Sequence, residues 1–266
     1  VFVEEGQSLR IEPFDPALVS DPSLIIYHPI RALGQWLIVT NGDQTDTVYN
    51  ALANGGSFES GLRTRTFEPD APNWTPRISG LMNLQDGACR LSILKAQDEQ
   101  GTRCQRHFFE YEACPGQGHF LHTYKGDGNP LPSFAGEPLC VGMPDDVEAF
   151  AIALWNSLHA DNRVALCVKV STAVQESCHR LQMARRYGKV KWSWQDYAAM
   201  LLQTPCEVTV RLLVFIIGIG TGGPDGGGPL AAAARAQFAV TVHSVLASDR
   251  RRRACPSLDV RPEFTE

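Results

Sequence analysis

The chain has 266 residues, of which 44% are hydrophobic and 20% charged, and its formal net charge is −5 at pH 7. A chain of this length and composition can bury a full core in one large or two small domains, which excludes a disordered or fibrous protein. The mildly acidic balance offers no basic surface for nucleic acid, and the arginine run at 250–253 is expected to be a solvated tail.

The eight cysteines are scattered, without a C-x-x-C pair or a metal-ligand spacing, so we expect reduced thiols in a cytoplasmic protein. No secretory signal opens the sequence. The longest strongly apolar run, 212–219, is far shorter than the ~20 residues of a membrane helix, so we expect no membrane partner. The chain begins with Val1, and we therefore expect either a processed protein or a fragment.

Hydrophobic patterning and turn residues predict two strands and two short helices in the first quarter of the chain. Asp46 and Ser57 are the side chains expected to cap the helices. In chain order the sequence predicts a strand at 24–27, a turn at 34–35, a strand at 36–39, a helix at 46–52 and a helix at 57–65.

The middle of the chain predicts two hairpins followed by a helix and a strand. Asp145 and Glu148 form a capping box, and one apolar stripe follows them at helical spacing. Because strands come in adjacent pairs and helices are grouped, this pattern favours an α+β fold. The predicted elements are strands 77–84 and 89–95, strands 106–112 and 118–125, a helix at 145–160 and a strand at 163–170.

The composition changes after residue 170, and we expect a domain at 1–170 followed by a C-terminal extension at 171–266. The glycine-rich stretch at 218–229 is expected to be a linker, since it lacks the G-K-[ST] ending of a P-loop and the dinucleotide spacing. A chain that ends at Gly220 is therefore expected to keep a folded core. The extension predicts a helix at 193–203, a strand at 208–219 and an alanine-rich helix at 230–247.

Several familiar kinds of catalytic site are disfavoured by the sequence. His119 and His122 lie three apart on a predicted strand and point to opposite faces, which disfavours a shared metal ion. No G-x-S-x-G elbow and no N-terminal Ser, Thr or Cys is present, so covalent catalysis is not indicated.

Amide, carboxylate, hydroxyl and cationic side chains cluster at the predicted strand ends, which suits a polar, nucleotide-sized ligand. The N-G-D at 41–43 could also be a simple turn, and 68–76 a proline-rich loop. Arg77 and Lys125 could bind a phosphate, and Tyr27 could donate to a carbonyl oxygen that gains negative charge. The members are Tyr27, Arg31, Asn41, Asp43, Gln44, Thr45, Asp46, Glu68, Asp70, Asn73, Thr75, Arg77 and Lys125.

All of these residues except Arg31 lie in stretches that resemble the archaeal-type IMP cyclohydrolase family, whose members close the purine ring in the last step of IMP synthesis. The resemblance covers roughly the first 170 residues and is closest to the longer bacterial-style members. It rests on DPSLIIY at 21–27, TNGDQTDT at 40–47, LRTRTFEPDAPNWTPRISG at 62–80, FEYE at 109–112 and GHFLHTYKGDGNPLPSF at 118–134.

The resemblance implies a four-layer αββα sandwich like that of N-terminal nucleophile hydrolases, used without such a nucleophile. It implies the substrate 5-formamidoimidazole-4-carboxamide ribonucleotide, whose carboxamide nitrogen attacks its own formyl carbon while water leaves. Both reacting groups lie on one molecule, so the protein must mainly orient them and handle protons. We expect no metal and no added cofactor, a purine nucleotide as partner, and no nucleic acid; assembly into a homo-oligomer stays open.

The resemblance also implies roles for the polar cluster. Tyr27 matches an active-site tyrosine of the family, and Arg77 with the acidic loop before it matches positions that face the substrate. The expected catalytic residues are Tyr27, Arg77, Glu68 and Asp70. The expected substrate-binding residues are Arg31, Asn41, Asp43, Gln44, Thr45, Asp46, Asn73, Thr75 and Lys125.

Two features of the chain depart from the family pattern. Family members begin with a strand and a Ser/Arg/Asn-rich segment ahead of the point where this chain starts, and the region after residue 171 matches nothing in them. The alternative expectation is therefore a truncated or catalytically inactive nucleotide-binding member of the same fold. A start codon with the missing strand upstream of Val1 would favour the enzyme, and a stop codon there the inactive protein.

Overall fold

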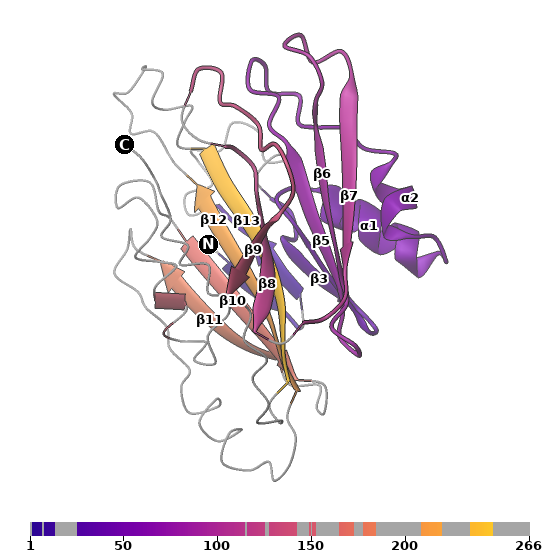
Figure 1. Cartoon of the computed structure of the whole chain (residues 1–266), viewed down its shortest axis with the longest axis vertical. Helices are drawn as coiled ribbons and strands as arrows, with labels where there is room; N and C mark the ends of the chain where they lie inside the picture. Colours follow the sequence, from indigo (N-terminus) through magenta and orange to yellow (C-terminus); the bar gives the residue numbers. More distant parts are fainter. Residues whose placement is uncertain are drawn as a thin grey trace.

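In the part of the chain that it describes, the computed structural model contains two antiparallel β-sheets, and two short helices follow one another in the first quarter of the sequence (Figure 1). It describes residues 2–6, 8–13, 26–114, 116–125, 128–142, 149, 151–152, 165–172, 178–184, 209–219 and 235–246.

The first sheet is a seven-stranded antiparallel meander in chain order. Each strand pairs with the next along the chain, so the short connections between β3 and β4 and between β5 and β6 are hairpin turns. Its strands are β1 (Phe2–Glu5), β2 (Ser8–Ile11), β3 (Ile30–Leu33), β4 (Trp36–Thr40), β5 (Arg77–Asn83), β6 (Cys89–Ala96) and β7 (Cys104–Tyr111).

The second sheet has six antiparallel strands in the order β11-β10-β12-β13-β8-β9. The longest strand, β13, lies in the middle of this sheet, where it pairs with β12 on one side and β8 on the other. The strands are β8 (Gln117–His122), β9 (Leu139–Gly142), β10 (Ala165–Thr172), β11 (Cys178–Ala184), β12 (Thr209–Ile219) and β13 (Arg235–Leu246).

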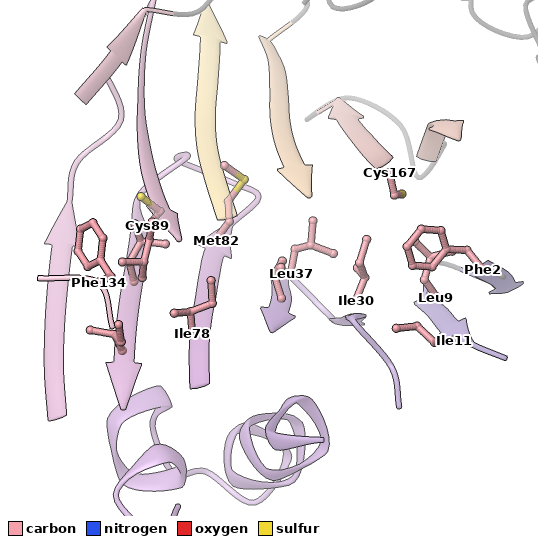
Figure 2. Packing of buried hydrophobic residues seen from close by; sticks show 14 residues of the cluster. Phe2, Leu9, Ile11, Ile30, Leu37, Ile78, Met82, Cys89, Phe134 and Cys167 are labelled. Atoms are coloured by element: carbon pink, nitrogen blue, oxygen red, sulfur yellow. The ribbon is translucent and has the colours of Figure 1, made fainter. Parts of the chain in front are cut away.

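The hydrophobic core lies on both faces of the first sheet, because side chains alternate along each strand. On β5, Ile78 and Met82 belong to a cluster that also contains Leu121 and Cys167 from the second sheet, so this cluster joins the two sheets (Figure 2). Leu81, which points the other way, packs in a second cluster with residues of α1 (Gln44–Ala53) and α2 (Phe58–Leu62). In the described part of the chain, α1 and α2 therefore cover one face of the first sheet, and the second sheet covers the other face.

Most of the predicted elements in the first part of the chain are confirmed. The strand at 36–39, the turn at 34–35, the hairpin of 77–84 with 89–95 and both short helices are present, with bounds that shift by a few residues. Ser57 caps α2 in a capping box with Ser60. The predicted strands at 163–170 and 208–219 correspond to β10 and β12.

Three expectations for the first half of the chain are wrong. The strand expected at 24–27 does not include Ile26 or Tyr27, and β3 begins only at Ile30. Asp46 does not cap α1, because the N-cap position is Asp43. The strands expected as a hairpin at 106–112 and 118–125 lie in different sheets as β7 and β8.

The alanine-rich segment expected as a helix at 230–247 contains β13 instead. Pairing along β12 and β8 satisfies the backbone groups of this segment and overrides the helical preference of its alanines. Gly218 and Ile219, at the start of the expected linker, belong to β12, and 220–229 lie outside the described residues.

Two expected helices fall largely outside the part of the chain that the structure describes. Of the helix at 145–160 only residues 149, 151 and 152 are described, and these are helical; the helix at 193–203 lies entirely outside. The fourth layer of an αββα sandwich and the division at residue 170 stay predictions. No helix among the described residues is long and apolar enough to cross a membrane.

Candidate functional site

The candidate site lies at one end of the first sheet, where β4 ends, α1 begins and β5 begins. Asn41 joins the two strands: its Nδ2 donates to the Pro76 carbonyl oxygen at 2.8 Å, and its Oδ1 accepts from the Ile78 amide at 2.9 Å. The Gln44 side chain donates to Asn41 Oδ1 at 3.0 Å and to the Ile78 carbonyl oxygen at 3.2 Å. The Asn41 side chain thus extends the hydrogen bonding between β4 and β5 beyond Thr40, the last paired residue of β4.

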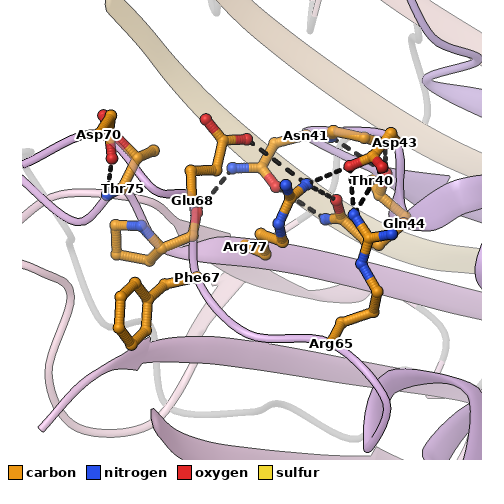
Figure 3. Close-up of polar contacts among 12 residues, drawn as sticks. Thr40, Asn41, Asp43, Gln44, Arg65, Phe67, Glu68, Asp70, Thr75 and Arg77 are labelled. Atoms are coloured by element: carbon orange, nitrogen blue, oxygen red, sulfur yellow. Dashed lines mark hydrogen bonds and ion pairs between the residues drawn. The ribbon is translucent and has the colours of Figure 1, made fainter. Parts of the chain in front are cut away.

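Arg77, the first residue of β5, is at the centre of a charged network (Figure 3). Its Nη1 donates to Asp43 Oδ1 at 2.6 Å and to Gln44 Oε1 at 2.7 Å, and lies 3.6 Å from Glu68 Oε1. Arg65 Nη2 donates to both Asp43 carboxylate oxygens, at 2.5 and 2.6 Å. The Asp43 carboxylate therefore bridges two guanidinium groups, and this side chain makes no hydrogen bond that caps α1.

Gly42 is the residue that lets this network close. A Cβ atom at position 42 would lie 2.6 Å from Arg77 Nη1, 2.6 Å from Gln44 Oε1 and 3.1 Å from Glu68 Oε1. Any side chain would therefore displace the guanidinium or the carboxylate. Glycine is needed here for space beside the site.

Glu68 is the most perturbed carboxyl group of the network. Only 15% of its side chain is exposed. Burial raises the pKa of Glu68 to about 7; Arg77 lowers it, and the nearby carboxylates of Asp70 and Asp43 raise it further. By contrast, burial alone would raise the pKa of Asp43, but hydrogen bonds from Arg65 and the charge of Arg77 hold it below the ordinary value. Two neighbouring carboxyl groups thus differ in protonation near neutral pH.

Tyr27 lies close to the same network. Its carbonyl oxygen accepts a hydrogen bond from the Ile11 amide at 2.9 Å, which ties the segment before β3 to β2. Burial raises the pKa of the Tyr27 hydroxyl, and the negative charge of Glu68 raises it further. The hydroxyl therefore stays protonated and can act as a hydrogen-bond donor.

The site loop, residues 67–75, brings Glu68 to Arg77 and is organised by Asp70. One Asp70 carboxylate oxygen accepts a hydrogen bond from the Thr75 amide at 2.7 Å, and the other accepts one from the Thr75 hydroxyl. Thr75 Oγ1 also lies 2.6 Å from the Tyr124 hydroxyl, just after β8. Asn73 Oδ1 accepts from the Leu131 amide at 3.1 Å. These bonds tie the loop to the segment between β8 and β9.

The remaining predicted residues lie around this network. Arg31, on β3, donates to Asp46 at 2.7 Å and lies over the Tyr49 ring, 3.5 Å from its centroid. Thr45 is buried, and its hydroxyl donates to the Gly42 carbonyl oxygen at 3.1 Å. Lys125 is exposed; its backbone amide donates to the Pro132 carbonyl oxygen at 2.8 Å.

Most of the predicted cluster thus lies at one end of the first sheet, where it forms two distinct groups of side chains. Asn41, Asp43, Gln44, Glu68 and Arg77 form one network with Tyr27 beside it, whereas Asp70, Asn73 and Thr75 stabilise the site loop. Arg31 pairs with Asp46 apart from Arg77, and Lys125 is bonded through its backbone amide to Pro132.

The sequence reasoning missed Arg65, Gly42 and Tyr124. All three lie within the stretches that carried the resemblance, so attention to residues beside the acidic and amide groups would have found them. His119 and His122 make separate contacts, with the Tyr111 ring and the Tyr124 carbonyl oxygen. Within the described ranges, no group of three His, Cys, Asp or Glu side chains converges as a metal site.

Comparison with known proteins identifies the family of the chain. Residues 1–176 match the family described as IMP cyclohydrolase-like protein, and because this match covers more than half of the sequence, the chain belongs to that family. A curated protein named IMP cyclohydrolase, from Methanothrix thermoacetophila, is 29% identical over 127 residues, which are 46% of this chain and 59% of the relative. The chain therefore spans less than two thirds of this relative's length.

Proposed function

We propose that the chain is an IMP cyclohydrolase, which closes the ring of 5-formamidoimidazole-4-carboxamide ribonucleotide to give IMP and water in purine biosynthesis. Membership of the IMP cyclohydrolase-like family and the name of the archaeal relative support this reaction. We infer with it the four-layer αββα arrangement, in which the predicted helix at 145–160 forms the outer layer. Ring closure within one substrate requires orientation and proton transfer.

The observation that carries the proposal is the Glu68 carboxyl group beside Arg77. Its pKa of about 7 is close to the pH at which a general acid or base is most effective. Arg77 lies 3.6 Å from it and limits its freedom to move. A carboxyl group of this kind can accept and return a proton within one reaction cycle.

In the first half of the reaction, the carboxamide nitrogen of the substrate forms a bond to the formyl carbon and gives one proton to ionised Glu68. The carbonyl electron pair moves to the formyl oxygen, which takes a proton from the Tyr27 hydroxyl. A donor aimed at an oxygen that gains negative charge stabilises the transition state. The raised pKa of Tyr27 ensures that the hydroxyl carries this proton beforehand.

In the second half, protonated Glu68 gives its proton to the new hydroxyl group, and the carbon–oxygen bond breaks to release water. The formamide nitrogen forms the ring double bond and returns its proton to Tyr27. The reaction thus regenerates the Glu68 carboxylate and the Tyr27 phenol, and no oxidant or reductant is required.

The other groups bind and orient the substrate in this proposal. Arg77 and Arg65, both held by Asp43, can exchange that carboxylate for an anionic group of the nucleotide. Because both oxygens of Asp70 accept hydrogen bonds from Thr75, we assign Asp70 to holding the loop and not to proton transfer. Lys125 remains a candidate for the phosphate.

The experiment supplies the formamido nucleotide to the purified full chain and measures IMP by its ultraviolet absorbance and by mass. Steady formation of IMP above the rate in buffer supports the enzyme. Tight binding of IMP without turnover would instead support an inactive nucleotide-binding member of the family. Arg77→Ala serves as the site control, since it should abolish either activity or binding.

A further inference from the structure

Trp74 has a backbone conformation that its large side chain does not favour. Its φ of 44° lies in the left-handed region, where glycine and asparagine are the usual residues. A tryptophan in this conformation is strained, and the strain persists only where contacts of the side chain stabilise the residue. The contacts of the ring therefore indicate why this residue occupies the site loop.

The Trp74 ring rests on the turn between β6 and β7. The Cβ atom that a residue other than glycine would carry at position 101 would lie only 2.5 Å from the indole, so the ring lies directly on the Gly101 backbone. Trp74 Nε1 donates to the Glu99 carbonyl oxygen at 3.0 Å. The Phe67 ring packs against the indole edge-on, with centroids 5.7 Å apart. Phe67 at the start of the site loop thus packs against Trp74 near its end.

The turn on which the ring rests is itself ordered by Asp98. One carboxylate oxygen of Asp98 accepts from the Thr102 amide at 2.8 Å. The other accepts from the Thr102 hydroxyl at 2.8 Å and from the Arg103 amide at 3.1 Å. A turn with three such bonds is a firm support for a neighbouring loop.

The ring is connected to Glu68 by a short path. The residue after Trp74, Thr75, accepts a hydrogen bond at its carbonyl oxygen from the Glu68 amide at 2.9 Å. We propose that Trp74 is a positioning residue for Glu68: by docking on the turn at 98–103, it holds the site loop closed over the buried carboxyl group. This inference rests on the proposed function only for the role of Glu68 in catalysis.

The environment of Glu68 provides a readout for this positioning. The charged and titratable groups that face it are Asp70 from the same loop, Asp43 from the start of α1, Arg77 from β5, Arg65 from after α2, and Tyr27 before β3. Burial is the main reason for the raised pKa of Glu68. If the loop opens, water reaches the carboxyl group and its pKa falls toward the ordinary value of 4.5.

The test is a carbon-13 NMR titration of Glu68 in the full chain labelled at glutamate carboxyl carbons, with Glu68→Gln to assign the signal. The variants are Trp74→Ala, which removes the ring, and Trp74→Phe, which keeps a ring but loses the N–H donor. Gln100→Ala, an exposed change in the same turn, and Trp36→Phe, at the far end of β4 from the site, are the matched controls.

We expect the pKa of Glu68 to fall markedly in Trp74→Ala, to fall less in Trp74→Phe and to stay unchanged in both controls. The rise of kcat with pH should move to lower pH in the same order, with KM changing less than kcat. A folded Trp74→Ala whose Glu68 titrates as in the wild type would overturn the inference. If that variant does not fold, Trp74→Phe decides by the same criterion.

The titration separates this inference from the proposed function. A wild type that forms no IMP would refute the function, yet Glu68 would still titrate and report the position of the loop. A wild type that forms IMP, with an unmoved Glu68 in the Trp74 variants, would refute the inference alone.

Discussion

At the scale of single residues, neighbouring groups of one chemical kind acquire different properties from their surroundings. Asp43 bonds two guanidinium groups and titrates low, whereas Glu68 is buried beside one and titrates near 7. The sequence predicted that both residues belong to the site. It could not predict which carboxyl group holds a proton, because burial of residue 68 depends on the closure of the site loop.

The raised pKa of Glu68 makes a prediction about stability. Its pKa is about 7 in the folded chain and 4.5 in the unfolded one, so the folded state binds more protons between those values. The free energy of unfolding contributed by Glu68 therefore falls as pH rises from 4.5 through 7, by about 3 kcal/mol as an order of magnitude. Glu68→Gln has no such proton to lose.

Urea unfolding of the wild type and Glu68→Gln at pH 5 and pH 8 checks this expectation. The variant should gain stability relative to the wild type at the higher pH. Parallel changes in the two proteins would mean that Glu68 is not buried in the folded chain.

Gly42→Ala should damage the site although it replaces none of the functional side chains. The added Cβ would lie 2.6 Å from Arg77 Nη1, so we expect kcat/KM to drop at least about tenfold and stability to fall by ~1–3 kcal/mol. Gly142→Ala is the matched control, since no described atom lies within 4 Å of its added Cβ. Equal activity of Gly42→Ala and the control would show that the network around Arg77 is not needed.

At the scale of elements, local patterns predicted β4, the hairpin of β5 with β6 and both short helices, because hairpin turns and capping residues act over a few positions. They failed where distant contacts decide. Asp43 is turned away from the helix amides by Arg65 and Arg77, which lie 22 and 34 residues further along the chain. One of the two partners of β8 is β13, over a hundred residues away, and no turn signal could reveal that pairing.

The position of β13 reverses the expectation for a chain that ends at Gly220. Such a truncation removes a strand that pairs along both of its edges and leaves β12 and β8 with unpaired backbone groups. We expect the shortened chain to lose cooperative thermal unfolding, while a chain that ends at Leu246 keeps it. A cooperative transition of the 1–220 chain within a few degrees of the full chain would contradict the placement of β13.

At the scale of the whole molecule, the site depends on segments that the two sheets hold together. The end of β4, the start of β5 and the site loop come from the first sheet and its connections, and Tyr124 reaches Thr75 from the end of β8 in the second. The family resemblance predicts that these segments belong to one site. The pairing of Arg31 with Asp46, apart from Arg77, follows from packing that no linear pattern encodes.

The central claim is that Glu68 transfers protons during closure of the purine ring. The most direct test is kcat for IMP formation as a function of pH in the wild type and Glu68→Gln. Because the ionised carboxylate starts the reaction, we expect wild-type kcat to rise with an apparent pKa near 7 and to level off above it. Glu68→Gln should be slower by about a hundredfold or more, with no break near pH 7. A variant with the wild-type rate and the wild-type pH profile would contradict the claim.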